Sequence, residues 1–194
     1  LLFWFNAVPI MTGTNRDEMK LFQLADPGLT KKLFGTFLTS RDKDVYDAAS
    51  DYASRMWRVR SVDEPAAMMA AAGHDAVYAY RFDWDEGGRF LFSDFAHLLG
   101  AGHAVEIPFV FNRFVLFGGL DKILYRSKTS ASRDRLSRAM GAYWAEFARS
   151  GNPSVEDLPD WPRWSENGVS LMRFDSEKDG GIGLISGADT MEAI

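Results

Sequence analysis

The sequence predicts an α/β fold, a mostly parallel sheet with helical cover that is incomplete in this chain. Segments typical of strands alternate with amphipathic helical segments, in the order strand, helices, strand, long loop, helix and short strand. Only two of the strands are well marked, which is too few for a sheet of this kind. We therefore expect further strands to come from residues outside this chain.

The first predicted strand covers residues 8–12, a compact apolar run that Gly13 stops. A polar turn follows, and a helix is predicted to begin near Met19. Thr14 or Asn15 would cap this helix, because short polar side chains accept hydrogen bonds from the free N–H groups of a first helical turn.

Two helices and the clearest strand come next. Apolar residues recur at three- and four-residue intervals over residues 43–59, which predicts a helix with one buried stripe. The members of that stripe are Val45, Ala48, Ala49, Tyr52, Ala53 and Met56. An Ala- and Met-rich helix is predicted over 64–72. Residues 76–84 alternate with period two and are rich in β-branched and aromatic residues, as in a strand.

The second half is predicted to hold a long ordered loop, a helix and a short strand. Residues 85–119 are rich in Phe and Gly without steady periodicity, and ordered loops of this length tend to be functional. Residues 132–150 return to an amphipathic helix pattern, and Gly151 is a typical C-terminal stop. A short strand is expected over 169–174.

Composition excludes several classes of protein. The 194 residues are 46% hydrophobic and 25% charged, which is typical of an ordered globular chain. The net charge is −5 and no stripe of Lys and Arg is present, so we expect no nucleic-acid partner. No apolar run reaches the ~20 residues that span a bilayer, so no membrane span is expected.

The chain contains no cysteine, which excludes a disulfide framework and a thiolate zinc site. This leaves the compartment open, with the cytoplasm slightly favoured. The sequence starts inside an aromatic cluster at Leu1, without a starting Met or the features of a signal peptide. We therefore expect a chain cut from a longer protein.

A pair of acidic residues, Asp17 and Glu18, stands in the turn directly after the first predicted strand. Ligands of open α/β sheets bind at the carboxyl ends of the strands, so a carboxylate in this turn is well placed for chemistry. A helix cap or a solvated acidic pair explains the same residues without any chemistry.

His103 lies on the long loop after the second strand, between small residues that let its ring reach a cleft. An imidazole exchanges its proton near neutral pH, which suits general acid–base catalysis. A structural hydrogen bond is the simpler alternative. Together, an acid after one strand and a histidine after the next reproduce the later part of the Ser…Asp/Glu…His order of α/β-hydrolases.

Four segments carry a resemblance to a known family. Residues 8–18 (VPIMTGTNRDE) resemble the strand-and-acid segment of type B carboxylesterases, the cholinesterase-like branch of the α/β-hydrolases. Residues 78–84, with the loop GH at 102–103 and EIPFVF at 106–111, resemble the strand and histidine loop of that family. WAEFARSGNP at 144–153 and WPRW at 161–164 resemble its late helix and its Trp-Pro turn.

The resemblance implies that residues 1–194 are the C-terminal portion of a single α/β-hydrolase domain acting on carboxylic esters. Glu18 would orient the imidazole, and His103 would be the base that activates a serine. No metal or organic cofactor is implied. Met19, after Glu18, and Ala104, after His103, depart from the family, which usually has Gly at both of these positions.

The expected nucleophile is absent. No Gly-x-Ser-x-Gly elbow occurs, and Gly87-Gly88 lacks the context of an oxyanion loop. Ser150 and Ser186 each adjoin a Gly but lack the strand–elbow–helix setting. The N-terminal part of the same fold would then supply the nucleophile elbow and the oxyanion loop. The same part, or another chain, would cover the sheet. The isolated chain is expected to be inactive.

Two alternatives stay open at this stage. A cholinesterase-like adhesion or binding protein can keep this frame without activity, and an unrelated binding domain with accidental motifs is a third possibility.

Aromatic residues on the long loop are candidates for a substrate pocket beside His103. We name Phe95, Phe109 and Phe111, together with His97, as possible lining residues. Packing in the core explains the same phenylalanines equally well. A metal site at His97 and His103 is not expected, because no third ligand lies nearby.

Overall fold

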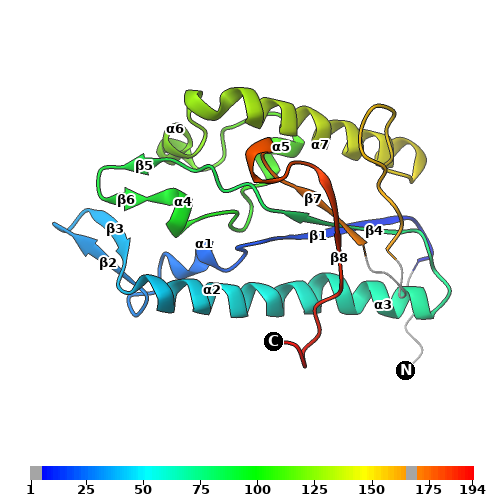
Figure 1. Cartoon of the computed structure of the whole chain (residues 1–194), viewed down its shortest axis with the longest axis horizontal. Helices are drawn as coiled ribbons and strands as arrows, with labels where there is room; N and C mark the ends of the chain where they lie inside the picture. The colour runs from blue at the N-terminus through cyan, green and yellow to red at the C-terminus, as the bar shows by residue number, and fades with distance from the viewer. Residues whose placement is uncertain (1–5, 165–169) are drawn as a thin grey trace.

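A four-stranded sheet lies at the centre of the protein, between two helical layers (Figure 1). The computed structural model describes residues 6–164 and 170–194. The strand order is β1 (Ile10–Asn15), β4 (Val77–Phe82), β7 (Ser170–Phe174) and β8 (Gly183–Ser186). The first three strands are parallel and β8 is antiparallel to β7. The predicted α/β class with a mostly parallel sheet is confirmed.

Long helices cover the two faces of this sheet (Figure 1). On one side α2 (Lys43–Arg58) continues through a π-helical turn, Val59–Asp63, into α3 (Glu64–Ala71). On the other side lies α7 (Ser130–Ser150), which ends at Gly151 in the left-handed conformation, with φ 76°. The backbone N–H of Gly151 donates to the carbonyl of Phe147, which closes the last turn as the sequence predicts.

Short elements fill the connections. The predicted loop 85–119 contains a hairpin, two single-turn helices and a 3₁₀ turn. Residue 169 of the last predicted strand lies outside the described residues. The helical elements not yet named are α1 (Lys20–Gln23), α4 (Phe95–Leu98), α5 (Ile107–Val110) and α6 (Asp121–Leu124), with 3₁₀ turns at Gly118–Leu120, Ser127–Thr129 and Glu177–Asp179. The hairpin strands are β2 (Thr30–Leu33), β3 (Phe37–Ser40), β5 (Arg89–Phe90) and β6 (Ser93–Asp94).

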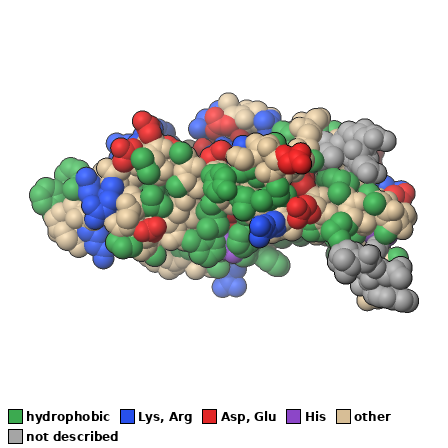
Figure 2. All heavy atoms as spheres, turned by 90° about the horizontal axis from the view of Figure 1, so that it is seen from below, with side chains coloured by type: hydrophobic (Ala, Val, Ile, Leu, Met, Phe, Trp, Pro, Cys, Tyr) green, Lys and Arg blue, Asp and Glu red, His purple; other side chains and the backbone are tan. Residues whose placement is uncertain are grey.

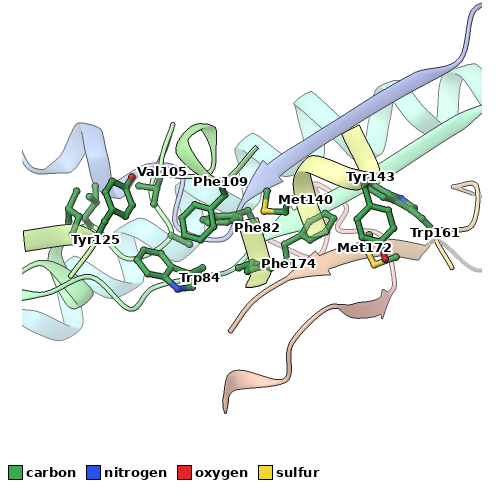
Figure 3. Close-up of a cluster of buried hydrophobic side chains, with 14 of the residues drawn as sticks. Phe82, Trp84, Val105, Phe109, Tyr125, Met140, Tyr143, Trp161, Met172 and Phe174 are labelled. Atoms are coloured by element: carbon green, nitrogen blue, oxygen red, sulfur yellow. The ribbon is translucent and has the colours of Figure 1, made fainter. Parts of the chain in front are cut away.

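The main hydrophobic core lies between the sheet and α7 and is largely aromatic (Figure 3). Phe82, Phe109 and Phe174 are fully buried, and their rings meet neighbouring rings edge-on at centroid distances of 5 to 6 Å. Edge-to-face contacts of this kind stabilise aromatic pairs beyond the area that they bury. The core therefore fixes both β4 and the helix α5, which carries Phe109.

The predicted buried stripe of α2 is wrong. Val45 and Tyr52 are 56% and 55% exposed, whereas the buried positions are Tyr46, Ser50, Ser54 and Arg58. Two of these residues form hydrogen bonds to other segments, since the Tyr46 hydroxyl donates to the carbonyl of Leu98 at 2.6 Å and Oγ of Ser54 accepts the N–H of Met19. An apolar pattern identifies the helix but does not decide which face the neighbouring segment covers.

The predicted end of the first strand is also wrong, because β1 runs through Gly13 to Asn15. Gly13 lies opposite Tyr80 in the register of β1 and β4. A Cβ atom at position 13 would lie 2.2 Å from a ring carbon of Tyr80. Glycine is required there by the close approach of an aromatic ring and does not stop the strand.

We expect Gly13→Ala to destabilise the protein by ~1–3 kcal/mol, because the half-buried Tyr80 ring packs against Trp144, Trp161 and Phe174 and cannot move aside freely. Gly183→Ala in β8 is the matched control, since nothing lies within 4 Å of its added Cβ. Urea unfolding of both variants measures the difference. Equal midpoints for the two would contradict this account of Gly13.

Part of the sheet is already covered by elements of this chain. Val77, Tyr78 and Ala79 of β4 are all buried by helices of this chain. In the described part of the chain β1 has one strand neighbour, so its outer edge is unpaired. Hydrophobic side chains also form a broad patch in the middle of the face shown in Figure 2. Among the described residues no helix is long and apolar enough to cross a membrane.

A buried carboxyl group follows β7. Asp175 is 5% exposed, and burial together with the nearby charge of Asp83 raises its pKa from 3.8 to about 6, although the N–H of Ser176 opposes the rise. Between these two values the folded protein binds more protons than the unfolded chain. The stability contributed at this position therefore falls as pH rises from about 4 to about 6 and stays low above that window.

We expect Asp175→Asn to raise the stability at pH 7 by on the order of 1–2 kcal/mol and to leave it almost unchanged at pH 4. The amide oxygen can still accept from Ser176, so the hydrogen bond is kept. Thermal unfolding across this pH range measures the effect, with the exposed Asp160→Asn as control. A variant no more stable than the parent at pH 7 would contradict the prediction.

Candidate active site

The parallel pairing of β1 and β4 brings two distant turns to one edge of the sheet. Six residue pairs run from Ile10 opposite Val77 to Asn15 opposite Phe82, so both strands end at the same level. The turn after β1 then meets the loop after β4. The N–H of Asp17 donates to the carbonyl of Ala101 at 3.0 Å.

Glu18 and His103 meet in this arrangement. Oε2 of Glu18 lies 2.7 Å from Nδ1 of His103, although 85 residues separate them in the sequence. Glu18 is 5% exposed, whereas the His103 side chain is 41% exposed. Because a carboxylate can only accept, Nδ1 of a neutral imidazole carries the proton and Nε2 is left as an acceptor. The pair is a carboxylate-oriented imidazole at the molecular surface.

The second oxygen of Glu18 is held by its own turn. Oε1 accepts the backbone N–H of Asn15 at 2.7 Å and the hydroxyl of Thr14 at 3.3 Å. Thr14 and Asn15 therefore donate hydrogen bonds to the Glu18 carboxylate. They do not cap a helix as predicted, because α1 begins only at Lys20 and its N-cap residue, Met19, makes no side-chain capping bond.

Two aromatic rings lie against the imidazole. Phe22 of α1 and Trp57 of α2 have ring centroids 5.3 Å and 5.5 Å from that of His103. The Oγ atom of Ser54 accepts the N–H of Met19 at 3.1 Å, which ties α2 to the turn that carries the acid. Through Ser54, the polar face of α2 therefore contacts the turn that carries Glu18.

Asp17 has different partners from Glu18. Its carboxylate forms ion pairs with Arg16 at 3.0 Å and with Lys20 at 3.1 Å, and it accepts the N–H of Ala101. Burial alone would raise the pKa of Asp17, but the two cations bring it below its ordinary value. Asp17 joins the two turns, and Glu18 is the member of the pair that contacts the imidazole.

The candidate pocket residues lie apart from this pair. Phe109 is fully buried and Phe95 is 8% exposed, so both pack in the core of this chain, which was the alternative to a place in the pocket. Phe111 is 74% exposed. His97 hydrogen-bonds Asp47 at 2.9 Å. These four side chains therefore have different surroundings, two in the core, one exposed and one paired with an aspartate. The pocket role of the four residues stays a prediction.

Four residues near the pair escaped the sequence analysis as site residues: Asn15, Phe22, Trp57 and Glu106. Most of their contacts join segments far apart in the chain, and only the position of Asn15, three residues before Glu18, was a usable signal. In the described part of the chain no serine hydrogen-bonds His103, and no group of three metal-ligating side chains is found.

Comparison with solved structures defines the class of protein. A carboxylesterase of Geobacillus stearothermophilus superposes with a TM-score of 0.61 at 23% identity, over 92% of this chain and 38% of that chain. A PNB esterase structure gives a TM-score of 0.58 at 25% identity, over 92% of this chain and 36% of that chain. The fold is that of an α/β-hydrolase, of which this chain contains a part.

The chain belongs to the carboxylesterase family, whose model matches residues 25–188. That range includes His103 and begins after Glu18. Para-nitrobenzyl esterase of Bacillus subtilis is 30% identical over 185 residues, 89% of this chain and 35% of that protein. Human cocaine esterase is 46% identical over 66 residues, 34% of this chain and 11% of that protein. The chain thus spans about a third of its bacterial relative.

Proposed function

We propose that this chain supplies the acid and the base of a carboxylic ester hydrolase. The observation that supports the proposal is the 2.7 Å contact between Glu18 Oε2 and His103 Nδ1 at the carboxyl edge of the sheet. Membership of the carboxylesterase family gives this pair its chemical context. The substrate would be a small-molecule carboxylic ester.

The geometry suits a general base. With Nδ1 held by Glu18, Nε2 of His103 would take the proton of an attacking serine hydroxyl. The serine oxygen would attack the ester carbonyl, and the imidazolium would then protonate the departing alcohol. A water molecule activated in the same way would hydrolyse the acyl-enzyme. Throughout, the buried charge of Glu18 would stabilise the imidazolium.

The nucleophile belongs outside residues 1–194 in this proposal. The 194 residues contain no Gly-x-Ser-x-Gly elbow, and the curated bacterial relative is about three times as long as the matched region. We propose that the chain is the C-terminal portion of one α/β-hydrolase domain, whose N-terminal part carries the serine and the oxyanion donors. The separate chain would then be inactive.

We expect His103→Ala in the full-length protein to lower kcat for a short p-nitrophenyl ester by ~10³-fold or more, because the serine loses its base. Glu18→Gln should cost ~10²–10⁴-fold, since the amide can present its N–H to Nδ1 and favour the wrong tautomer. Steady-state hydrolysis measures both, with the 194-residue chain as a negative control.

Asp17→Asn is the matched comparison for Glu18→Gln, because the neighbouring carboxylates differ in their partners. Loss of the ion pairs with Arg16 and Lys20 should lower the melting temperature of Asp17→Asn, while its kcat falls far less than that of Glu18→Gln. Full activity in His103→Ala would refute the role of His103. A full-length protein that lacks the serine and hydrolyses no ester would favour the alternative, an inactive binding or adhesion protein.

A further inference from the structure

Asn15 is a buried polar side chain that joins the turn of Glu18 to the loop of His103. It is the last residue of β1, is 2% exposed and faces Phe82 in the register of the sheet. Its side-chain nitrogen Nδ2 donates to the carbonyl of Gly102 at 2.7 Å and to Oε2 of Glu106. These acceptors lie one residue before and three residues after His103.

The chemistry of the two acceptors fixes the orientation of the amide. A backbone carbonyl cannot donate, and an ionised carboxylate can only accept, so both must face the –NH₂ group. Of the neutral side chains close to this size, only asparagine offers two N–H donors from one nitrogen. Aspartate would place a third oxygen against the carbonyl of Gly102 and the carboxylate of Glu106.

Asn15 also lies between the buried carboxylate of Glu18 and the half-buried carboxylate of Glu106. Its backbone N–H donates to Glu18 Oε1 while its side chain donates to Glu106 Oε2. Burial raises the pKa of Glu106, the Asn15 hydrogen bond opposes that rise, and the charge of Glu18 adds to it. One residue therefore supplies donors to two groups that would otherwise repel each other in a poorly solvated site.

We propose that Asn15 is a positioning residue, whose amide clamps the histidine loop on both sides of His103 and so holds the imidazole against Glu18. The expected effect of Asn15 on catalysis rests on the proposed function. Its expected effect on the hydrogen bond between His103 and Glu18 does not. Both halves of the residue act together: the backbone fixes the acid and the side chain fixes the loop of the base. A displacement of ~1 Å between reacting groups can cost on the order of 10²-fold in rate.

The test compares Asn15→Ala with Ser137→Ala in the full-length protein. Ser137 is fully buried and donates to the carbonyl of Phe109 at 2.7 Å, so its loss removes a buried hydrogen bond of the same kind from the same loop, away from His103. The first readout is the far-downfield proton NMR signal of the imidazole N–H that bonds Glu18. This signal needs neither substrate nor nucleophile.

We expect Asn15→Ala to lose or broaden that signal and to lower kcat by ~10–100-fold, with KM changed less than about twofold. Ser137→Ala should lower the melting temperature to a comparable degree while keeping the signal and kcat. An Asn15→Ala protein that retains both would overturn the proposal. If the full-length protein hydrolyses no ester, the NMR comparison alone tests the positioning role of Asn15. Failure of the esterase function is therefore distinguishable from failure of the clamp.

A second pair of variants covers the case in which Asn15→Ala does not fold. Glu106→Gln keeps an oxygen that can accept from Asn15, whereas Glu106→Ala removes it. We expect Glu106→Gln to keep the imidazole signal and kcat, and Glu106→Ala to lose or broaden the signal and lower kcat. Equal signal and equal kcat in these two variants would overturn the clamp.

Discussion

The site depends on the parallel register between β1 and β4. That register places the end of each strand at one edge of the sheet, so that turns 85 residues apart in the sequence lie in contact. A shift by one residue would turn every side chain of β1 to the opposite face. Gly13 protects the register, because a larger residue there would collide with the Tyr80 ring.

The polar groups at that edge form a connected network in a largely buried setting. Glu18 uses both of its oxygens, one for His103 and one for the backbone of Asn15, and Asp17 joins the same two turns through its ion pairs and the N–H of Ala101. A buried carboxylate without such donors would cost several kcal/mol. The fold therefore tolerates charge at this edge because neighbouring turns supply N–H groups, two cations and the His103 ring.

The aromatic core and the site share elements. The loop that carries His103 leads directly into α5, whose Phe109 is fully buried against Phe82 and Trp84. Packing of α5 in the core limits how far the imidazole can move, and Trp57 of α2 also contacts it. The stability of the core and the geometry of the pair are thus linked through one short segment.

The sequence by itself determined the α/β class, the helix α7 with its glycine stop, the strands β1 and β4, and the choice of Glu18 and His103 as a candidate pair. These features follow from local patterns: periodicity, a left-handed glycine and the order of motifs along the chain. Only the tertiary structure decided that Gly13 lies within a strand, that α2 buries Tyr46 and Ser54, that Phe109 is core, and that Asn15 joins the turn of Glu18 to the loop of His103. Each of these depends on a partner distant in the sequence, and a local pattern carries no information about which partner will lie opposite.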